Sequence, residues 1–224
     1  HGLSEYIFPF LLIKLLNRNI HIVLKVSNSG KKSTFKKLRK KFLFFGNFLI
    51  YFGVKYVDKW ICINSEIKSE LLNEKVPTKK IFCLPNGVEI PPNNTFFPEK
   101  KLFSIAWVGA LVAHKNIRLA LEIINKLPSN YSLHIYGTGS LKSSIREYIS
   151  CNNLDNRVFL EGWLERTILY SKLKKHSIYL STSIAEGMSN SLLESIALGL
   201  IPVCSNIEAN NEVLRRTPLP EFNT

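Results

Sequence analysis

Residues 185–194 read AEGMSNSLLE, and this stretch decides the fold of the chain. It follows a strand-like run, Ser177–Ser181, and it opens a helix-like run. Ser189, Asn190 and Ser191 are favoured at helix N-caps, so the stretch predicts a strand that passes through a small-residue loop into a helix N-terminus. The first N–H groups of such a helix are unpaired and its dipole is positive there, which is the arrangement of an anion site.

Two glutamates, Glu186 and Glu194, flank this predicted helix start with seven residues between them. Glu186 falls in the predicted loop, and Glu194 falls about one turn inside the predicted helix. A carboxylate accepts hydrogen bonds from sugar hydroxyls, whereas the helix N-terminus suits phosphate. The stretch therefore suits a ligand that has a diphosphate in the middle and a hydroxylated ring at each end.

The composition is that of an ordinary globular protein. The 224 residues have room for one large or two small domains, and 46% of them are apolar. No run of about 20 residues is free of charge, so no certain transmembrane helix is predicted. The four cysteines have no C-x-x-C spacing, and Cys62, Cys83 and Cys204 fall in predicted buried strands. We expect reduced core residues rather than a disulfide or a zinc site.

The net charge of +13 predicts an anionic partner: phospholipid headgroups, nucleic acid or anionic substrates. Seven basic residues lie between Lys31 and Lys41 with no acid among them, and residues 31–57 become strongly aromatic. Two interpretations of this stretch are open: a core helix with a solvated basic start, or a membrane-surface helix whose lysines meet anionic lipid. Nucleic-acid binding is not expected, because no nucleic-acid module is recognisable. The apolar residues at helical spacing are Phe35, Leu38, Phe42, Phe45 and Leu49.

The first part of the chain predicts a portion of one α/β domain. Asn86–Gly87 is expected to turn the chain through positive φ. Residues 89–101, rich in proline, asparagine and charge, are expected to be a linker. The predicted elements are a helix at 3–17, a strand at Ile20–Val26, a helix within 31–57, a strand at Trp60–Ser65, a helix at Glu66–Asn73 and a strand at Ile81–Leu84.

After the linker, strands and helices alternate, which predicts a parallel sheet with helices on both faces. Loops at the carboxyl ends of such strands bind ligands, and Gly109, Gly137, Gly139 and Gly162 fall on these loops. Trp163 could stack on a base or cover the core, and we expect the core. The predicted strands are 103–108, 132–136, 157–160, 177–181 and 201–204, with helices at 117–127, 140–149, 166–174, from the Ser189 region to near Gly199, and at 209–216.

EGMSNSLLE followed by SIALGLIPVCS resembles the E-x7-E signature of retaining glycosyltransferases of the GT-B fold, closest to glycosyltransferase family 4. IFCLPNGV before the linker and Lys115-Asn116 after the first glycine loop resemble further motifs of that family. The resemblance implies an α/β fold: a partial N-terminal, acceptor-side Rossmann-like domain at 1–88, a linker at 89–101, and a truncated nucleotide-sugar domain at 102–224. Such enzymes need two domains, so the chain is expected to be a fragment.

The resemblance also implies roles for individual residues. Glu186 would be the catalytic residue that faces the donor sugar, Glu194 would hold the ribose, and Lys115 would neutralise the diphosphate. Ala110 stands where the family usually has an arginine, and Ser27 stands where many members have a histidine. His114 and Arg118 are the candidates to compensate for Ala110. The implied donor-binding set is Gly109, Lys115, Asn116, Gly137, Gly139, Gly162, Gly187, Met188, Ser189, Asn190, Ser191, Leu192 and Glu194.

The implied activity is retaining transfer from a nucleotide-diphosphate sugar to a glycan or lipid-linked acceptor, in polysaccharide, lipopolysaccharide or glycoconjugate synthesis. No metal or cofactor is expected, because the chain has neither a D-x-D motif nor His/Cys ligand spacing. The implied location is cytoplasmic, or peripheral at the inner face of the membrane. Two alternatives stay open: a GT-B nucleotide-sugar epimerase, against which E-x7-E argues, and a non-catalytic membrane- or partner-binding remnant, which Ala110 and Ser27 favour.

Overall fold

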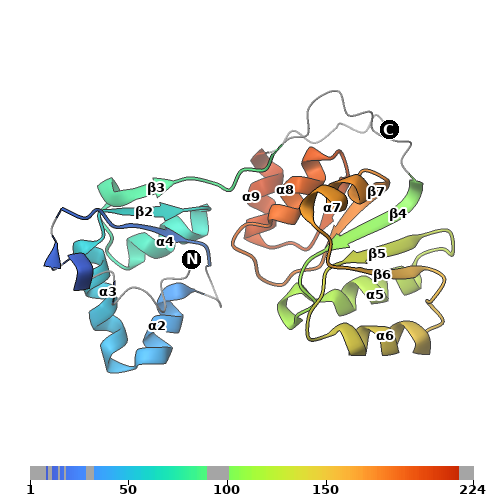
Figure 1. Ribbon diagram of the computed structural model, residues 1–224, viewed down its shortest axis with the longest axis horizontal. Coiled ribbons are helices and arrows are strands. Elements are labelled where there is room, and N and C mark those ends of the chain that lie inside the picture. The colour runs from blue at the N-terminus through green and yellow to red at the C-terminus, as the bar shows by residue number, and fades with distance from the viewer. Residues whose placement is uncertain are drawn as a thin grey trace. The chain divides into compact units, whose positions relative to one another are not determined.

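The computed structural model describes residues 9, 12–14, 16–17, 19–28, 33–89 and 101–216 (Figure 1). These residues divide into two compact units. Unit 1 holds the described residues up to Asn86, together with Ala185–Met188 and the part of α9 (Glu208–Arg216) from Asn211 onward. Unit 2 holds the described residues of Gly87–Ile184 and Ser189–Asn210. Each unit is described separately.

Unit 1 is built on a parallel sheet of three strands in the order β1-β2-β3. Buried apolar side chains from its helices and strands form the core, among them Phe35, Trp60 and Ile67. The Asn64 side chain accepts a hydrogen bond from the Ile67 N–H and so caps the helix that follows β2. The elements are β1 (Val23–Val26), α2 (Thr34–Phe42), α3 (Phe44–Tyr56), β2 (Lys59–Cys62), α4 (Ser65–Asn73), η2 (Thr78–Lys80) and β3 (Ile81–Cys83).

The helix predicted within residues 31–57 is two helices, so this prediction was wrong. The chain breaks between α2 and α3 at Leu43, whose φ is 42°. Gly46 then lets α3 approach α2, because a Cβ there would lie 2.7 Å from Arg39 Cα. The break redirects the predicted apolar stripe: Phe35, Leu38 and Leu49 are buried, whereas Phe42 and Phe45 are exposed.

Two other predictions for the first half were also wrong. Asn86 and Gly87 do not have positive φ, and the chain continues from β3 without a turn. Cys62 is buried as expected, but its neighbour Cys83 is exposed on the edge strand and Cys204 is only half-buried. The predicted helix at 3–17 lies largely outside the described residues, as do residues 90–100 of the predicted linker.

Unit 2 carries a parallel sheet of five strands in the order β6-β5-β4-β7-β8. Figure 1 shows α5 and α6 on one face of the sheet and α7 and α8 on the other. This arrangement confirms the predicted α/β fold with a parallel sheet. The elements are β4 (Lys101–Val108), η3 (Ala113–Lys115), α5 (Ile117–Lys126), β5 (Ser132–Tyr136), α6 (Lys142–Cys151), β6 (Val158–Gly162), α7 (Arg166–Leu173), β7 (His176–Ser181), α8 (Asn190–Ala197) and β8 (Ile201–Cys204).

The strand order of unit 2 reverses between β4 and β7. The chain winds outward from β4 through β5 to β6, and then returns to β7 on the other side of β4. Open α/β sheets bind ligands outside the carboxyl ends of their strands at such a switch point. The core beneath is continuous, since the α5 residues at helical spacing are buried against β4 and β5: Ile117, Ala120, Leu121 and Ile124.

Candidate functional site

The loops that follow β4, β5 and β6 are hydrogen-bonded to one another. The Gly109 N–H donates to the Tyr136 carbonyl at 3.0 Å, and the Gly137 N–H donates to the Gly162 carbonyl at 2.7 Å. The Leu111 N–H donates to the Thr138 carbonyl at 3.0 Å. The three predicted glycine loops therefore form one continuous backbone surface at the carboxyl edge of the sheet.

This surface requires glycine at two positions. Gly137 has φ of 144°, and a Cβ on it would lie 1.9 Å from the Gly109 carbonyl oxygen. A Cβ on Gly139 would lie 2.5 Å from the Leu111 carbonyl oxygen. Any side chain would push the loops apart, so the glycines are needed for the close approach of backbone to backbone.

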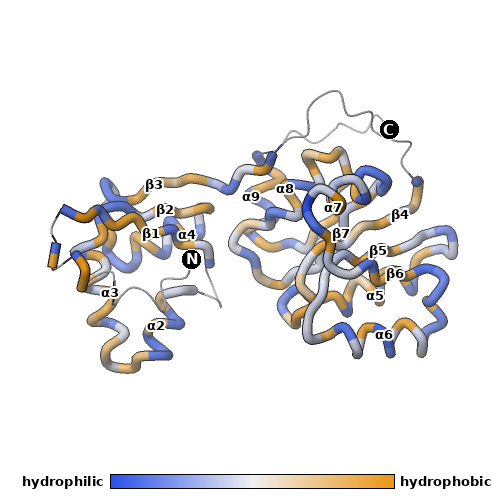
Figure 2. The backbone as a smooth tube through the Cα atoms, in the orientation of Figure 1, coloured by the Kyte–Doolittle hydropathy of each residue, from blue (hydrophilic) through white to orange (hydrophobic). Residues whose placement is uncertain are grey.

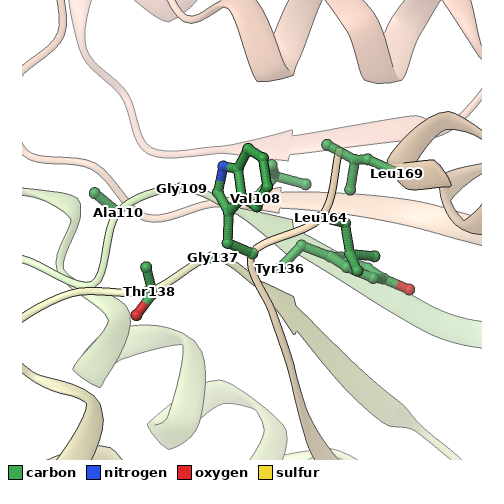
Figure 3. A pocket seen from close by; sticks show the side chains of 9 residues that line it. Val108, Gly109, Ala110, Tyr136, Gly137, Thr138, Leu164 and Leu169 are labelled. Carbon is green, nitrogen blue, oxygen red and sulfur yellow. The ribbon is translucent and has the colours of Figure 1, made fainter. Parts of the chain in front are cut away.

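A pocket of about 410 Å³ opens over these loops. This volume falls within the range of small-molecule sites, roughly 300–1,000 Å³. Figure 3 shows Ala110 and Thr138 at one end of the pocket and Leu164 and Leu169 at the other. The pocket thus offers small side chains and backbone groups at one end and apolar walls at the other. Its lining residues are Val108, Gly109, Ala110, Tyr136, Gly137, Thr138, Trp163, Leu164 and Leu169.

Trp163 lies at this pocket and not in the core, so the prediction of a core residue was wrong. Its side chain is 73% exposed, and it lines the pocket immediately after β6. The other two tryptophans, Trp60 and Trp107, are buried. A flat indole at the wall of an open pocket can stack on a planar ring.

Lys115 lies beside the first glycine loop. The position of a Cβ on Gly109 would be 3.5 Å from Lys115 Cε, so the lysine side chain runs along this glycine. Asn116 follows in the left-handed region, with φ of 49° and ψ of 45°, and begins α5. Arg118 is engaged elsewhere, because it pairs with Glu122 at 3.0 Å and stacks over Tyr148. It is therefore a poor substitute for the arginine that Ala110 replaces.

Two residues that the sequence analysis did not single out join the loops at the switch point. The Thr182 hydroxyl, just after β7, donates to the Lys115 carbonyl at 3.0 Å and accepts from Trp107 Nε1 at 3.1 Å. The Ile184 N–H donates to the His114 carbonyl at 2.9 Å. Thr182 therefore sets the position of the Lys115 backbone. A threonine directly after a predicted strand was the available signal.

Glu194 is held by an arginine that the sequence analysis also missed. Its side chain is only 14% exposed, and its Oε1 lies 3.1 Å from the guanidinium of Arg166 at the start of α7. Arg166 Nε in turn donates to the Tyr170 hydroxyl at 2.8 Å. Burial raises the pKa of Tyr170; the hydrogen bond from Arg166 opposes this rise and the Glu194 carboxylate adds to it, so the pKa is raised overall and the phenol stays protonated.

The start of α8 is organised by hydroxyl groups. Ser189 is the N-cap, and its Oγ accepts from the Leu192 N–H at 3.4 Å. Ser191 Oγ lies 2.8 Å from the Tyr179 hydroxyl and 3.1 Å from Ser189 Oγ. Leu192 has a fully buried side chain, whereas Asn190 is exposed. The helix start is therefore where the sequence predicts it, but the Leu192 side chain belongs to the core.

The predicted donor residues are thus distributed over both units. Gly109, Lys115, Asn116, Gly137, Gly139 and Gly162 come together at the carboxyl edge of the unit 2 sheet, and Ser189–Glu194 lies in unit 2 as well. Glu186, Gly187 and Met188 belong to unit 1. Glu186 and Gly187 are half-buried, and Met188 is buried. Their roles stay predictions.

The described residues form neither a metal-binding cluster nor a membrane-spanning helix. Within residues 33–89, 101–216 and the shorter described segments, no group of three or more His, Cys, Asp and Glu side chains is placed to hold a metal ion. Over the same residues, no helix has the length and apolar character needed to cross a membrane.

Similar proteins are known for most of the chain. An Escherichia coli UDP-Gal:alpha-D-GlcNAc-diphosphoundecaprenol alpha-1,3-galactosyltransferase is 31% identical over 178 residues, which is 71% of this chain and 46% of that protein. A Staphylococcus aureus poly(ribitol-phosphate) alpha-N-acetylglucosaminyltransferase is 29% identical over 139 residues, which is 61% of this chain and 27% of that protein. The chain spans less than half the length of both relatives.

Solved structures share the fold. Anabaena HepE in complex with UDP and glucose has a TM-score of 0.74 at 13% identity, covering 94% of this chain and 59% of that one. The pneumococcal O-GlcNAc transferase GtfA in complex with UDP and GlcNAc has a TM-score of 0.63 at 21% identity, covering 86% and 38%. The fold is the GT-B type that the resemblance implied. The family model of the Glycosyl transferases group 1 matches residues 103–218, just over half of the chain, and the chain therefore belongs to this family, as the resemblance to glycosyltransferase family 4 implied.

Proposed function

We propose that this chain carries the donor side of a transferase that moves a sugar from a nucleotide-diphosphate sugar to a glycan or lipid-linked acceptor, with retention of configuration. The proposed setting is the synthesis of cell-surface polysaccharide, lipopolysaccharide or another glycoconjugate. One observation carries the proposal: an open pocket of about 410 Å³ over three hydrogen-bonded glycine loops at the carboxyl edge of a parallel sheet.

The nucleotide occupies this pocket. The base stacks on the exposed indole of Trp163, between the apolar walls that Leu164 and Leu169 supply. The E. coli relative is named for UDP-Gal, and the HepE structure holds UDP. These two names support a uridine nucleotide as the donor carrier.

The diphosphate lies toward Lys115 and the loop N–H groups. Lys115 runs along Gly109, where a backbone without a side chain leaves phosphate oxygens room to approach. Charge that develops on the leaving diphosphate is stabilised by this ammonium, because fixed donors act strongly where water is excluded. A hydrogen bond to a charged group contributes about 1.5–3 kcal/mol. We propose that no metal ion takes part.

The two glutamates act on the hydroxylated ends of the donor. Glu194 accepts hydrogen bonds from the ribose, and Arg166 holds its carboxylate in place. Glu186 orients the donor sugar, as the resemblance implies. The sugar reacts on one face, and the leaving phosphate assists deprotonation of the acceptor. The acceptor side meets an anionic membrane surface through the basic stretch Lys31–Lys41, of which Lys31 and Lys32 lie outside the described residues.

Tryptophan fluorescence tests the pocket directly, because Trp163 is the one exposed indole among the three. UDP should quench the fluorescence of the parent and raise its melting temperature, whereas GDP and ADP should do so less. A ligand at about 100 times its dissociation constant adds roughly 2.7 kcal/mol of stability. Binding should be unchanged in EDTA.

Three variants complete the test. Trp163→Phe should keep the thermal shift and lose the quenching, and Glu194→Ala should lose both. Trp60→Phe is the matched control, because Trp60 is buried in the core of unit 1 and its loss should leave the quenching intact. If UDP quenches Trp163→Phe as strongly as the parent, the nucleotide binds elsewhere and the proposed site is wrong.

A further inference from the structure

Two cysteine side chains meet at the carboxyl end of the unit 1 sheet, on the neighbouring strands β2 and β3 (Figure 1). Cys62 is the last residue of β2, Cys83 is the last residue of β3, and the two are register partners. Their Sγ atoms lie 3.0 Å apart, and both are free thiols in the structure. The sheet thus brings together two thiols that are 21 positions apart in the sequence.

The backbone around this pair has the geometry that a disulfide needs. Neighbouring strands lie about 4.8 Å apart, and the Cα atoms of a disulfide are usually about 4.4–6.8 Å apart. Register partners on parallel strands also direct their side chains to the same face of the sheet. Cys62 and Cys83 can therefore be bridged without rearranging the sheet.

The two thiols differ in their access to solvent. Cys83 is exposed on the edge strand β3, whereas Cys62 is fully buried on the central strand β2. Burial raises the pKa of Cys62 to about 12, and the neighbouring Cys83 thiol acts in the same direction, so Cys62 is a protonated thiol in the resting chain. Cys83 is therefore the sulfur that a dissolved reagent meets first, and Cys62 is the sulfur that reacts second.

The strand that carries Cys83 is short and lies at the edge of the sheet. β3 has three residues, and its order in the sheet gives it β2 as a neighbour. Just beyond it, the Leu84 N–H donates to the Cys62 carbonyl at 2.8 Å. A covalent bond at this point would fasten an exposed edge strand to the centre of the sheet, and it would close a loop that contains α4.

We propose that Cys62 and Cys83 form a reversible redox modification site, at which exchange with a small dissolved disulfide such as oxidised glutathione joins them in an intrachain disulfide. The Cys83 thiolate attacks one sulfur of the reagent, which forms a mixed disulfide and releases one glutathione thiolate. The sulfur of Cys62, after losing its proton, then attacks the Cys83 sulfur and releases the second glutathione. Both protons pass through solvent to the departing thiolates. Two protein thiols are oxidised while one disulfide is reduced to two thiols.

The second step is favoured by the position of Cys62. Because its Sγ already lies beside the Cys83 Sγ, the attack is intramolecular and proceeds at a high effective concentration. Cys151, which is exposed in unit 2, would stop at the mixed disulfide. A metal ion explains the pair less well, because within the described ranges no group of three or more His, Cys, Asp and Glu side chains is placed to hold one.

The test needs neither a nucleotide nor a sugar acceptor, so its outcome is independent of the proposed function. The reduced full chain is incubated with mixtures of reduced and oxidised glutathione, quenched with acid and analysed by mass spectrometry and peptide mapping. We expect a linked peptide that joins Cys62 to Cys83, with the loss of two hydrogen atoms, and its reversal by dithiothreitol. A Cys83 that keeps its glutathione, or that links to a second chain on a non-reducing gel, would overturn the proposal.

Cys62→Ser isolates the second step, because it keeps the exposed Cys83 and removes the thiol that resolves the adduct. Glutathione should persist on Cys83 in this variant and leave it in the parent. Cys151→Ser combined with Cys204→Ser is the matched control, since both residues lie in unit 2 and their loss should leave the bridge unchanged. Circular dichroism confirms that each variant is folded.

A comparison in urea keeps the test valid even if Cys62→Ser does not fold. The equilibrium constant for bridge formation with glutathione is measured for the parent in buffer and in concentrated urea. We expect it to be at least about tenfold larger in the folded chain, because the sheet holds the two thiols together. An equal or smaller constant in the folded chain would mean that the fold does not favour the bridge, and the proposal would be wrong.

Discussion

The loops after β4–β6 and the turn between α2 and α3 both depend on a glycine that admits another backbone, yet the loops form a pocket and the turn exposes apolar side chains. Gly137 brings two loops together under a pocket that Trp163 lines. Gly46 brings two helices together and leaves Leu43 and Phe45 exposed at a turn. The loops form the floor of a pocket, whereas the turn between α2 and α3 exposes apolar side chains, and Figure 2 draws this turn largely in the hydrophobic colour. Similar residue types therefore give two different surfaces, because of the backbone geometry that each glycine permits.

The largest effect is expected from a substitution of Gly137, which would disrupt the pocket. In Gly137→Ala the new Cβ would meet the Gly109 carbonyl at 1.9 Å, and the residue would also hold φ of 144°. We expect a loss of about 3 kcal/mol or more in the free energy of unfolding, together with loss of nucleotide binding. Urea denaturation and fluorescence titration measure the two.

Gly87→Ala is the control for this variant. A Cβ on Gly87 would have no atom within 4 Å, and its φ is not positive, so stability should change by less than about 0.5 kcal/mol. Equal effects of the two substitutions would mean that the loops are not packed as described.

The second prediction concerns how the stability of unit 2 depends on pH. His176 is the first residue of β7, where its Nε2 is 2.7 Å from the Tyr136 hydroxyl and its Nδ1 is 2.7 Å from Ser104 Oγ. Burial, with the charges of His134 and Lys101, lowers the pKa of His176 to about 3. The unfolded chain binds this proton near pH 6.5, so the contribution to stability is complete above that pH and is lost as pH falls toward 3.

Unfolding followed between pH 7 and pH 4 should reveal a loss of about 3 kcal/mol from this group. His176→Asn should flatten the dependence over this range. Ser177→Ala is the matched control, because Ser177 is the next residue on β7 and carries no group that titrates in this range, so the slope should stay unchanged. A parent protein whose stability is constant over this range would contradict a buried neutral His176.

The third prediction concerns the close approach of α3 to α2 at Gly46. In Gly46→Ala a Cβ would meet Arg39 Cα and the Leu38 carbonyl oxygen, both backbone atoms closer than 3 Å. Alanine is the better helix former by about 1 kcal/mol, so we expect a net loss of roughly 1–2 kcal/mol in stability. Tyr51→Ala, an exposed change on the same helix, should cost less than about 0.5 kcal/mol. Denaturant melts compare them, and a stabilising Gly46→Ala would refute the close crossing.

The smallest effect on stability is expected at Arg166. Its pair with Glu194 is half-exposed on the arginine side, so Arg166→Ala should leave the stability nearly unchanged. It should nevertheless weaken UDP binding, because the Glu194 carboxylate loses the group that orients it. Arg118→Ala removes a similar exposed pair, with Glu122, and should leave UDP affinity unchanged. Equal UDP affinity in both variants would argue against a positioning role for Arg166.

Local patterns predicted the elements that depend on local signals. The strands Ser132–Tyr136 and Ile201–Cys204 have the predicted bounds, and Ser189 caps α8 as the composition indicates. In each case a short apolar run or a capping hydroxyl acts within a few residues along the chain. The glycine loops were also predicted, because only glycine fits where neighbouring backbones approach this closely.

Long-range contacts account for the failures. The break at Leu43 follows from the close approach of α3 to α2 at Gly46, and periodicity alone continues through it. Asn86 and Gly87 are residue types typical of turns, but the chain continues from β3 without a turn. Tryptophan is a residue type common in protein cores, and only its place after β6 puts Trp163 at the pocket.

The amino-acid sequence by itself determined the alternation of strands and helices, the glycine loops at their carboxyl ends and the family to which the chain belongs, because these are written in neighbouring residues. Tertiary structure alone decided that Arg166 holds Glu194, that Thr182 joins Lys115 to Trp107, and that Gly46 of α3 packs against the backbone of α2. The physical reason is that each of these depends on side chains from separate elements meeting in space, which no local spacing encodes.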